Sequence, residues 1–295
     1  VIPCFEYATG VRVDAAAAAD LGLEAGTPVS YRAGDQPNNA FSLNVLDPGE
    51  VAATGGTSGV VYGVTDVPRP DRFSRVNTFL HVNHEPRRPR YGVLLCINGT
   101  GILNAWVKKT TVPDMSYPEV NRRCAEIPVG SEGVLMLPFG NGAERMLGNR
   151  YTGAEAIGLD LNRHDRFHLL RAAQEGIAFA FRYGMDVMRE TGLRLRVIRA
   201  GYANLFLSPV FRQTLATLCG ADIELYNTDG ALGAARGAAL GAGLYASREE
   251  TFASLRKIDE VRPDPADRDV LERGYARWKA ELENRLGRAS HGTSV

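Results

Sequence analysis

The chain has 295 residues, of which 44% are hydrophobic and 23% charged, so it carries enough apolar material for the core of a globular protein. Lys plus Arg and Asp plus Glu each number 34, and this balance excludes an overall field that would recruit nucleic acid or an anionic membrane. No apolar run approaches the length that a transmembrane helix requires.

Short apolar runs alternate with helical patterns along the chain, which predicts an α/β domain with a mixed sheet. The expected strands end in glycine or proline turns and cover 10–13, 28–31, 50–54, 60–64 and 91–98, with two more inside 195–227. The expected helices cover 15–21, 38–46, 117–123, 169–191 and 230–245, with further ones inside 99–109 and 195–227. The segment 50–64 therefore predicts a hairpin that has Thr57 and Ser58 at its tip.

Two other segments differ from this alternation. Residues 66–90 are rich in proline and arginine, which predicts a surface excursion, and the basic run 84–90 is interpreted as a solvated turn. Beyond Ser254 the sequence is charged, with apolar residues such as Tyr275 and Trp278 about one turn apart. That pattern predicts a C-terminal helix docked on the domain, followed by a disordered end over 287–295.

Three glycine turns each follow an apolar strand, at 55–59, 99–101 and 200–204. Glycines at strand ends let a ligand approach the backbone, and exposed N–H groups form a nest for phosphate oxygens. Taken singly, each is better explained as a tight turn. None is a P-loop, and none is a convincing dinucleotide-binding fingerprint.

Asp35 lies in a turn beside the amides of Gln36, Asn38 and Asn39. Phosphoryl transfer needs positioned phosphates, a metal and an acid that takes a hydroxyl proton, and Asp35 with the glycine hairpin supplies part of that set. Asp35 is explained equally well as a cap of the helix expected to begin near Asn38. The local pattern leaves both interpretations open.

Other chemistries have weaker support. The pairs His81 with His84 and His164 with His168 lack a third ligand nearby, so no histidine metal site is expected. Ser58 lacks the Gly-x-Ser-x-Gly elbow of a serine hydrolase.

The four cysteines, Cys4, Cys96, Cys124 and Cys219, lie far apart and form no Cys-x-x-Cys pair. Cys96 and Cys219 stand in apolar contexts, which predicts buried free thiols. The pattern favours a reducing, cytoplasmic setting over a disulfide scaffold. Since Val1 opens a segment typical of the middle of a protein, a fragment or processed product is also expected.

An ordered series of segments resembles the C-terminal half of the FGGY carbohydrate kinases, and most of all their xylulose-phosphorylating members. The match runs from about residue 10 to about residue 247 through "GTPVSYRAGDQ", "GEVAATGGTSGVVY", "YGVLLCINGTGILNAWVKK", "LPFGNGAER", "RAGYANLFLSPVFRQTLATLCGADIELYN" and "GALGAARGAALGAG". The resemblance implies an actin-like, ribonuclease-H-like ATPase fold, in which two domains clamp ATP and sugar between them. It divides the chain into a nucleotide-binding domain (1–247) and a helical tail (248–295), with the family's N-terminal sugar-binding domain absent.

The resemblance also implies roles for individual residues. Asp35 matches the family's general base, which takes the proton of the sugar hydroxyl, and Gln36 lies beside the sugar. Gly56, Thr57 and Ser58 match the hairpin that receives the ATP phosphates.

Further matches concern the nucleotide. Gly101 precedes the helix that carries the family tryptophan, here Trp106. Gly201 and Asn204 match a turn near the nucleotide, and Ala200 stands where the family has a glycine, which is expected to alter that pocket.

The implied reaction is ATP-dependent phosphorylation of a ketopentose, with D-xylulose expected first and Mg²⁺ as the metal. Other FGGY substrates (ribulose, gluconate or glycerol) stay open. So does a non-catalytic nucleotide-binding module, because the family's Asp-x-Gly-Thr loop does not occur in this sequence. The expected partners are the sugar, ATP and the N-terminal domain, and a homodimer stays open.

Overall fold

The computed structural model describes the backbone of residues 5–291 and the side chains of residues 10–287. Its strands, in chain order, are β1 (Phe5–Arg12), β2 (Pro28–Ala33), β3 (Glu50–Gly55), β4 (Gly59–Thr65), β5 (Asn77–Leu80), β6 (Tyr91–Ile97), β7 (Leu135–Phe139), β8 (Gly153–Ile157), β9 (Val197–Gly201), β10 (Asp222–Tyr226) and β11 (Lys257–Val261). Its α-helices are α1 (Ala15–Leu21), α2 (Asp35–Ser42), α3 (Gly101–Thr111), α4 (Tyr117–Glu126), α5 (Arg166–Glu190), α6 (Pro209–Cys219), α7 (Gly230–Gly241), α8 (Arg248–Thr251) and α9 (Arg268–His291).

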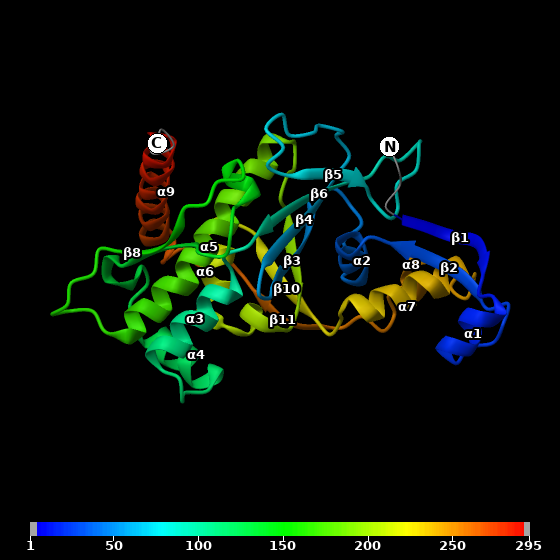
Figure 1. Cartoon of the computed structure of the whole chain (residues 1–295), viewed down its shortest axis with the longest axis horizontal. Coiled ribbons are helices and arrows are strands. Elements are labelled where there is room, and N and C mark those ends of the chain that lie inside the picture. The colour runs from blue at the N-terminus through cyan, green and yellow to red at the C-terminus, as the bar shows by residue number, and fades with distance from the viewer. Residues whose placement is uncertain (1–4, 292–295) are drawn as a thin grey trace.

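A mixed sheet forms the centre of the molecule (Figure 1). Within residues 5–291 it has seven strands in the order β11-β10-β9-β3-β4-β6-β5. β9 runs parallel to both β3 and β10, whereas β4, β6, β5 and β11 join their neighbours antiparallel. The antiparallel pairs β1–β2 and β7–β8 lie at opposite ends of the molecule (Figure 1). The predicted α/β fold with a mixed sheet is confirmed.

Helices cover both faces of this sheet. α5 and α6 pack on one face against β4, β6 and β10, and α2 packs on the other against β3 and β4. The predicted buried face of α5 is confirmed, since Leu170, Ile177 and Phe181 are each 0% exposed. α5 begins where the Asp165 carboxylate accepts hydrogen bonds from the amides of Phe167 and His168, which satisfies the first free donors of the helix.

Some elements differ from the sequence-based expectation. The segment 66–90 is not only a surface excursion, because β5 lies within it and forms the edge of the main sheet beside β6. α2 begins at Asp35, three residues earlier than expected, because Pro37 is accepted in the first turn of a helix. The β7–β8 pair and the edge strand β11 had not been predicted.

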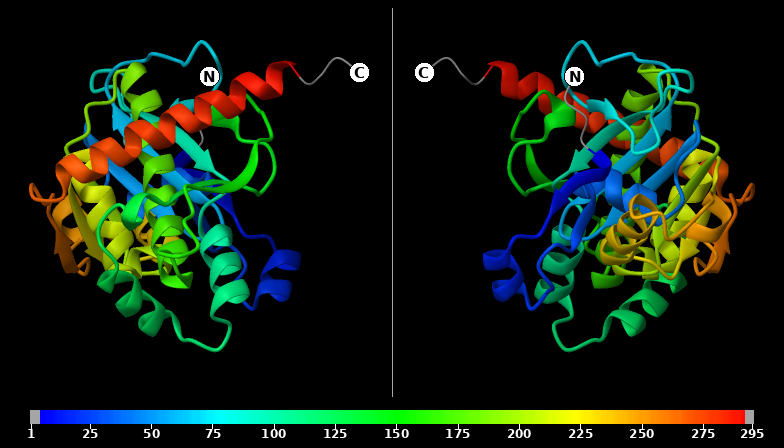
Figure 2. Two further views of the ribbon diagram at one scale, coloured as in Figure 1. Left: turned by 90° about the vertical axis from the view of Figure 1, so that its left-hand side faces the viewer. Right: turned by 90° about the vertical axis from the view of Figure 1, so that its right-hand side faces the viewer.

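The C-terminal helix docks on the domain as predicted. α9 runs diagonally across the outside of the molecule (Figure 2) and packs on β7, α5 and α6. The disorder predicted from Gly287 is wrong up to His291, because α9 continues through that residue. The rest of that segment, 292–295, lies outside the described residues.

The cysteines are partly as expected. Cys124 and Cys219 are buried free thiols, but Cys96 is exposed, because alternate residues of β6 face opposite sides of the sheet. Cys4 lies outside the described residues. Among the helices described, none is both long and apolar enough to cross a membrane.

Candidate functional site

The glycine hairpin (residues 55–59, between β3 and β4) is bonded to the first turn of α3. The Gly101 amide donates to the Gly56 carbonyl at 3.0 Å, and the Ile102 amide donates to the Thr57 carbonyl at 3.1 Å. A Cβ on Gly101 would lie 2.3 Å from the Gly56 oxygen, so only glycine permits this approach. These two amides are therefore occupied and do not form a phosphate nest; they hold the hairpin in place.

A buried carboxylate holds the turn that leads into α3. Glu144 is 0% exposed and accepts hydrogen bonds from the amides of Asn98 (3.1 Å) and Gly99 (2.9 Å). Burial raises the pKa of Glu144, while these two hydrogen bonds oppose the shift. Sequence reasoning missed this residue, although it belongs to the "LPFGNGAER" segment that carried part of the resemblance.

A cavity of about 510 Å³ opens beside the glycine hairpin. Most of its lining surface is apolar, and we call it the polar cavity only because Thr57, Asn104, Asn121, Asn204 and Ser208 are among its lining residues. It is lined by Gly55, Gly56, Thr57, Gly101, Ile102, Asn104, Ala105, Tyr117, Asn121, Asn204, Leu205, Leu207 and Ser208. The structure thus brings together Gly56, Thr57, Gly101 and Asn204, four of the residues expected near the nucleotide. Ser58 and Gly201 do not line it, and sequence reasoning missed Asn104, Asn121 and Ser208.

Asn204 and its neighbours shape one wall of the polar cavity. Asn204 has a φ of 53°, in the left-handed region that asparagine tolerates better than most residues. A Cβ on Gly56 would lie 3.9 Å from the Nδ2 atom of Asn204, so the side-chain amide of Asn204 faces the hairpin. Ala200 is 0% exposed within β9 and does not line the cavity, so its methyl group belongs to the core. Gly201 lies against the Thr228 carbonyl, 3.0 Å from where a Cβ would stand.

Asp35 is the first residue of α2, and its side chain is exposed. Its Oδ1 accepts from the Gln36 amide at 2.8 Å and its Oδ2 from Gln36 Nε2 at 3.1 Å. The N-cap position belongs to Gly34, and Asp35 makes none of the described capping bonds to a later turn. This geometry disfavours the helix-cap interpretation and leaves an oriented, accessible carboxylate.

Gln36 presents an unused acceptor next to this carboxylate. Its Oε1 atom is buried, and among the described residues it has no hydrogen-bond partner. A buried carbonyl without a partner is unfavourable by about 1–3 kcal/mol.

Asp35 lies near the edge of the sheet at which the glycine hairpin emerges. α2 packs against β3 and β4, the two strands that the hairpin joins. The negative charges of Asp35 and Glu144 both act on the thiol of Cys96, next to last in β6. Loss of hydration around the sulfur raises the pKa of the Cys96 thiol. The charge of Arg145 opposes this shift, and the charges of Asp35 and Glu144 add to it.

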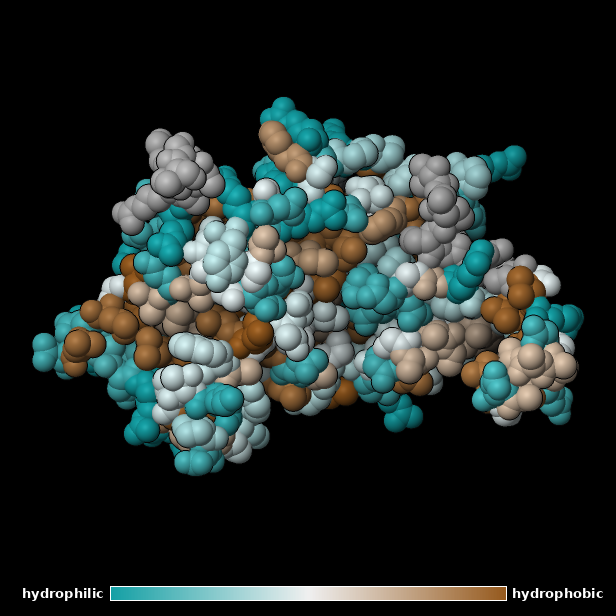
Figure 3. Space-filling model, viewed as in Figure 1, coloured by the Kyte–Doolittle hydropathy of each residue, from teal (hydrophilic) through white to brown (hydrophobic). Residues whose placement is uncertain are grey.

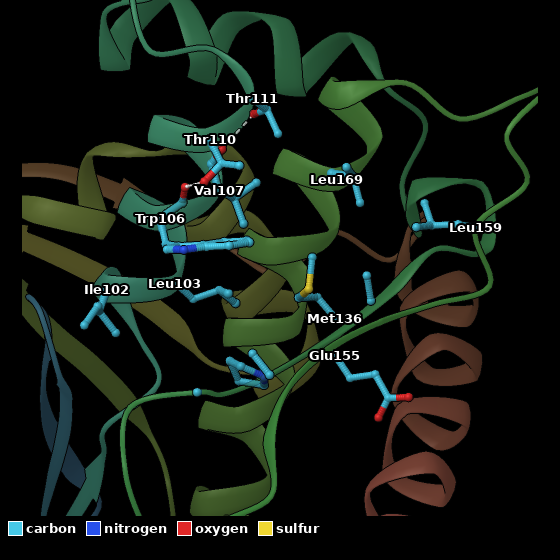
Figure 4. A pocket seen from close by; sticks show the side chains of 14 residues that line it. Ile102, Leu103, Trp106, Val107, Thr110, Thr111, Met136, Glu155, Leu159 and Leu169 are labelled. Carbon is cyan, nitrogen blue, oxygen red and sulfur yellow. Dashed lines mark hydrogen bonds between the residues drawn. The ribbon is translucent and has the colours of Figure 1, made fainter.

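A second cavity, of about 550 Å³, lies on another side of α3 and is called the apolar cavity (Figure 4). Trp106, which matches the family tryptophan, lies across it near Leu103 and Met136 (Figure 4). Hydrophobic side chains also gather on the surface between α3 and β8 (Figure 3). Among the lining residues described, Glu155 carries the one charged side chain, and it lies 3.6 Å from Arg285. Such a lining offers little to a phosphate.

The histidine pairs are engaged within the protein. His81 Nε2 contacts the Val45 carbonyl at 2.8 Å and its Nδ1 contacts the Tyr62 hydroxyl at 3.1 Å. His168 lies between Asp165 and Glu132, acidic partners that sequence reasoning had not placed. In the part of the chain that the structure describes, no group of three or more His, Cys, Asp or Glu residues could hold a metal ion.

The fold is that of an actin-like ATPase, a mixed sheet flanked by helices with a polar cavity and an exposed acid near one edge. The chain belongs to the FGGY family of carbohydrate kinases: the model of that family's C-terminal domain matches residues 51–246.

Similar proteins agree with this assignment. The chain is 30% identical to the xylulose kinase of Bacillus subtilis, over 79% of this chain and 46% of that protein. It is 29% identical to the L-xylulose/3-keto-L-gulonate kinase of Escherichia coli, over 90% and 52% respectively. The crystal structure of xylulose kinase from Rhodospirillum rubrum superimposes with a TM-score of 0.81 at 27% identity, covering 95% of this chain and 56% of that one. The chain thus spans about half the length of the curated relatives it matches.

Proposed function

We propose that this chain supplies the nucleotide site and the general base of an ATP-dependent sugar kinase, with a ketopentose such as D-xylulose as the acceptor. The observation that carries the proposal is the meeting of Gly56, Thr57, Gly101 and Asn204 in one polar cavity. Asp35 lies near the same edge of the sheet as an oriented acid. The similarity to xylulose kinase and to L-xylulose/3-keto-L-gulonate kinase supports a sugar kinase, and because these relatives act on different sugars, the sugar itself has to be measured.

In the proposed reaction, ATP lies in the polar cavity with its phosphates toward the glycine hairpin. A primary hydroxyl of the sugar attacks the γ-phosphorus, and its proton passes to the Asp35 carboxylate. The new O–P bond forms as the bond between the γ-phosphorus and the β–γ bridging oxygen breaks, and ADP leaves. Gln36 holds the carboxylate in place, because its backbone N–H and its side-chain Nε2 group both donate to Asp35.

Mg²⁺ fits this arrangement because it prefers oxygen ligands and is held in kinases largely by the nucleotide's own phosphates. The exposed Thr57 hydroxyl, at the tip of the hairpin, is the oxygen group of this chain that would join those phosphates in holding it. When bound, the ion supplies positive charge that neutralises the transferred phosphoryl group.

The first experiment replaces Asp35 with Asn in the full-length protein. Asp35→Asn keeps the shape of the side chain and removes its ability to take a proton, so kcat should fall by about 10²–10⁴-fold. The Kd for ATP should stay within about twofold, because Asp35 does not line the polar cavity. ADP release in a coupled assay and calorimetric titration with ATP measure the two quantities.

The control is Asp229→Asn, which changes another exposed aspartate at a helix start, where it caps α7 through the Leu232 amide. Asparagine caps helices as well as aspartate does, so this variant should keep both kcat and Kd. Near-normal turnover of Asp35→Asn would sink the assignment of the base.

A non-catalytic nucleotide-binding module is the second candidate. It is favoured by one observation: the polar cavity is built from residues of this chain. A panel of xylulose, ribulose, gluconate and glycerol in the ADP-release assay separates the candidates. ATP binding without turnover on any of these acceptors supports the module, and turnover on one of them identifies the sugar.

A further inference from the structure

One buried glutamine joins three of the polar side chains that line the polar cavity. Gln174 lies in the middle of α5 and is 0% exposed. Its Nε2 donates to Asn121 Oδ1 at 3.2 Å and, more weakly, to Asn104 Oδ1 at 3.5 Å. Its Oε1 accepts from the Ser208 hydroxyl at 2.6 Å. Side chains from α3 and α4 and from the start of α6 therefore meet at one amide group.

The hydrogen-bond pattern fixes which way this amide points. Ser208 Oγ accepts the Phe211 amide at 3.3 Å as the N-cap of α6, so its own proton is available for one acceptor. The 2.6 Å contact to Gln174 Oε1 is the length of an O–H···O bond and takes that proton. The Nε2 group of Gln174 must then face Asn104 and Asn121, which places the carbonyl oxygens of both asparagines toward it.

The consequence is a wall of the cavity with a defined hydrogen-bonding character. Because both Oδ1 atoms are used by Gln174, the NH₂ groups of Asn104 and Asn121 are left, and neither donates to any residue that the structure describes. Both asparagines line the polar cavity, as does the half-exposed ring of Tyr117. Amide N–H donors beside an aromatic ring suit a planar heterocycle whose ring nitrogens are acceptors.

We propose that Gln174 is a positioning residue for the nucleobase: it orients Asn104 and Asn121 so that their NH₂ groups hydrogen-bond the acceptor nitrogens of a purine. This inference rests on the proposed nucleotide site and adds to it a base-recognition end. The glycine hairpin serves the phosphates, and the wall formed by the two asparagines serves the base.

The test is equilibrium binding of two probes, ATP and inorganic tripolyphosphate, to the full-length protein and its variants. Gln174→Leu keeps the approximate volume and removes both the donor and the acceptor. The Kd for ATP should rise about tenfold, the equivalent of losing one or two net hydrogen bonds, while the Kd for tripolyphosphate stays within about twofold. Gln213→Leu is the matched control. Gln213 lies in α6 and does not line the polar cavity, and its Nε2 donates to the Thr217 hydroxyl and the Arg262 carbonyl.

Asn121→Ala is the second variant, because Asn121 is only half-buried and its loss leaves the core intact. It should weaken ATP severalfold and leave tripolyphosphate unchanged. A role of Gln174 in packing alone predicts either no change or an equal loss for both probes, and either result overturns the proposal. Wild-type protein that binds no ATP contradicts the nucleotide site itself, whereas wild-type binding with unaltered variants contradicts only the role of Gln174.

Discussion

At the scale of single residues, the buried His81 makes the free energy of unfolding depend on pH, although it lies outside the candidate site. It is 0% exposed, and its two ring nitrogens face the Val45 carbonyl and the Tyr62 hydroxyl. In the neutral ring, Nε2–H donates to the carbonyl and Nδ1 accepts from the hydroxyl, so both contacts are satisfied without a charge. Burial lowers the pKa of His81 to about 4, the Val45 hydrogen bond opposes the shift, and the charge of Arg90 adds to it.

This environment predicts a pH dependence with a definite sign. Below the ordinary histidine pKa of about 6.5, His81 is protonated in the unfolded chain but stays neutral in the folded chain. The free energy of unfolding therefore decreases as the pH falls from about 6.5 toward 4. The loss from this group should reach roughly 2–3 kcal/mol between pH 7 and pH 4.5. Urea unfolding at the two pH values measures it in the wild type, in His81→Gln and in the control His84→Gln.

Glutamine does not titrate, so His81→Gln should lose distinctly less stability on acidification than the wild type. His84→Gln makes the same substitution at a neighbouring, half-buried histidine and controls for the loss of an imidazole ring as such. An equal slope in all three proteins would show that other groups cause the acid sensitivity.

Residues of the candidate site differ in how far sequence could predict them. Asp35, Gly56 and Thr57 lie in short segments whose local pattern is explained equally well or better by a helix cap or a tight turn, and the resemblance gave them their roles. Gln174 could not be predicted in this way, because its partners Asn104 and Asn121 are 70 and 53 positions away. It stands in a helix whose spacing indicates only a buried face.

At the scale of elements, the contact between the glycine hairpin and α3 depends on one missing side chain. Gly101→Ala would place a Cβ 2.3 Å from the Gly56 oxygen and 2.9 Å from its carbon, and both atoms are backbone. α3 must then move away from the hairpin and loosen the two hydrogen bonds between them. We expect the free energy of unfolding to fall by about 1–3 kcal/mol and the Kd for ATP to rise about tenfold or more.

The matched control is Gly287→Ala in α9, where an added Cβ meets no atom of the described residues within 4 Å. Alanine is the better helix former, so this variant should be up to about 1 kcal/mol more stable, with ATP binding unchanged. Urea unfolding and calorimetry compare the two. If Gly101→Ala binds ATP like the wild type, the junction does not shape the nucleotide site.

Element prediction succeeded where apolar runs are long and failed at edges. β3, β4 and β6 are mostly apolar and were predicted, because most residues of these central strands are buried. The edge strands β5 and β11 were missed, and both are short, with β11 reading Lys-Ile-Asp-Glu-Val. Three of the five residues of β11 are charged, as is common for edge strands, and β5 (Asn-Thr-Phe-Leu) has only four residues, so neither gives a clear strand signal in the sequence.

At the scale of the whole molecule, the segment after residue 247 is packed into the domain that precedes it. It contributes β11 to the main sheet and α9 to the core. Trp278 of α9 is 0% exposed, and its indole N–H donates to the Met136 carbonyl at 2.9 Å. Its ring packs with those of Phe139, Phe179 and Tyr275. α9 contacts both β7 and α5. β7 contributes Met136 to the lining of the apolar cavity, and α5 carries Gln174, which holds two asparagines of the polar cavity, so α9 supports both.

The two tryptophans of the chain allow a matched test of this packing. Trp278→Ala removes a fully buried ring and leaves the Met136 carbonyl without its donor, so the free energy of unfolding should fall by about 3–5 kcal/mol. Trp106→Ala removes a ring that is 63% exposed at the apolar cavity and should cost less than about 1 kcal/mol. Far-UV circular dichroism during urea unfolding is the suitable measurement, since it does not depend on tryptophan fluorescence. Comparable decreases in the free energy of unfolding in the two variants would mean that α9 is a peripheral helix. The large difference that we expect would make α9 part of the cooperative core, which holds α5 and therefore Gln174 in place.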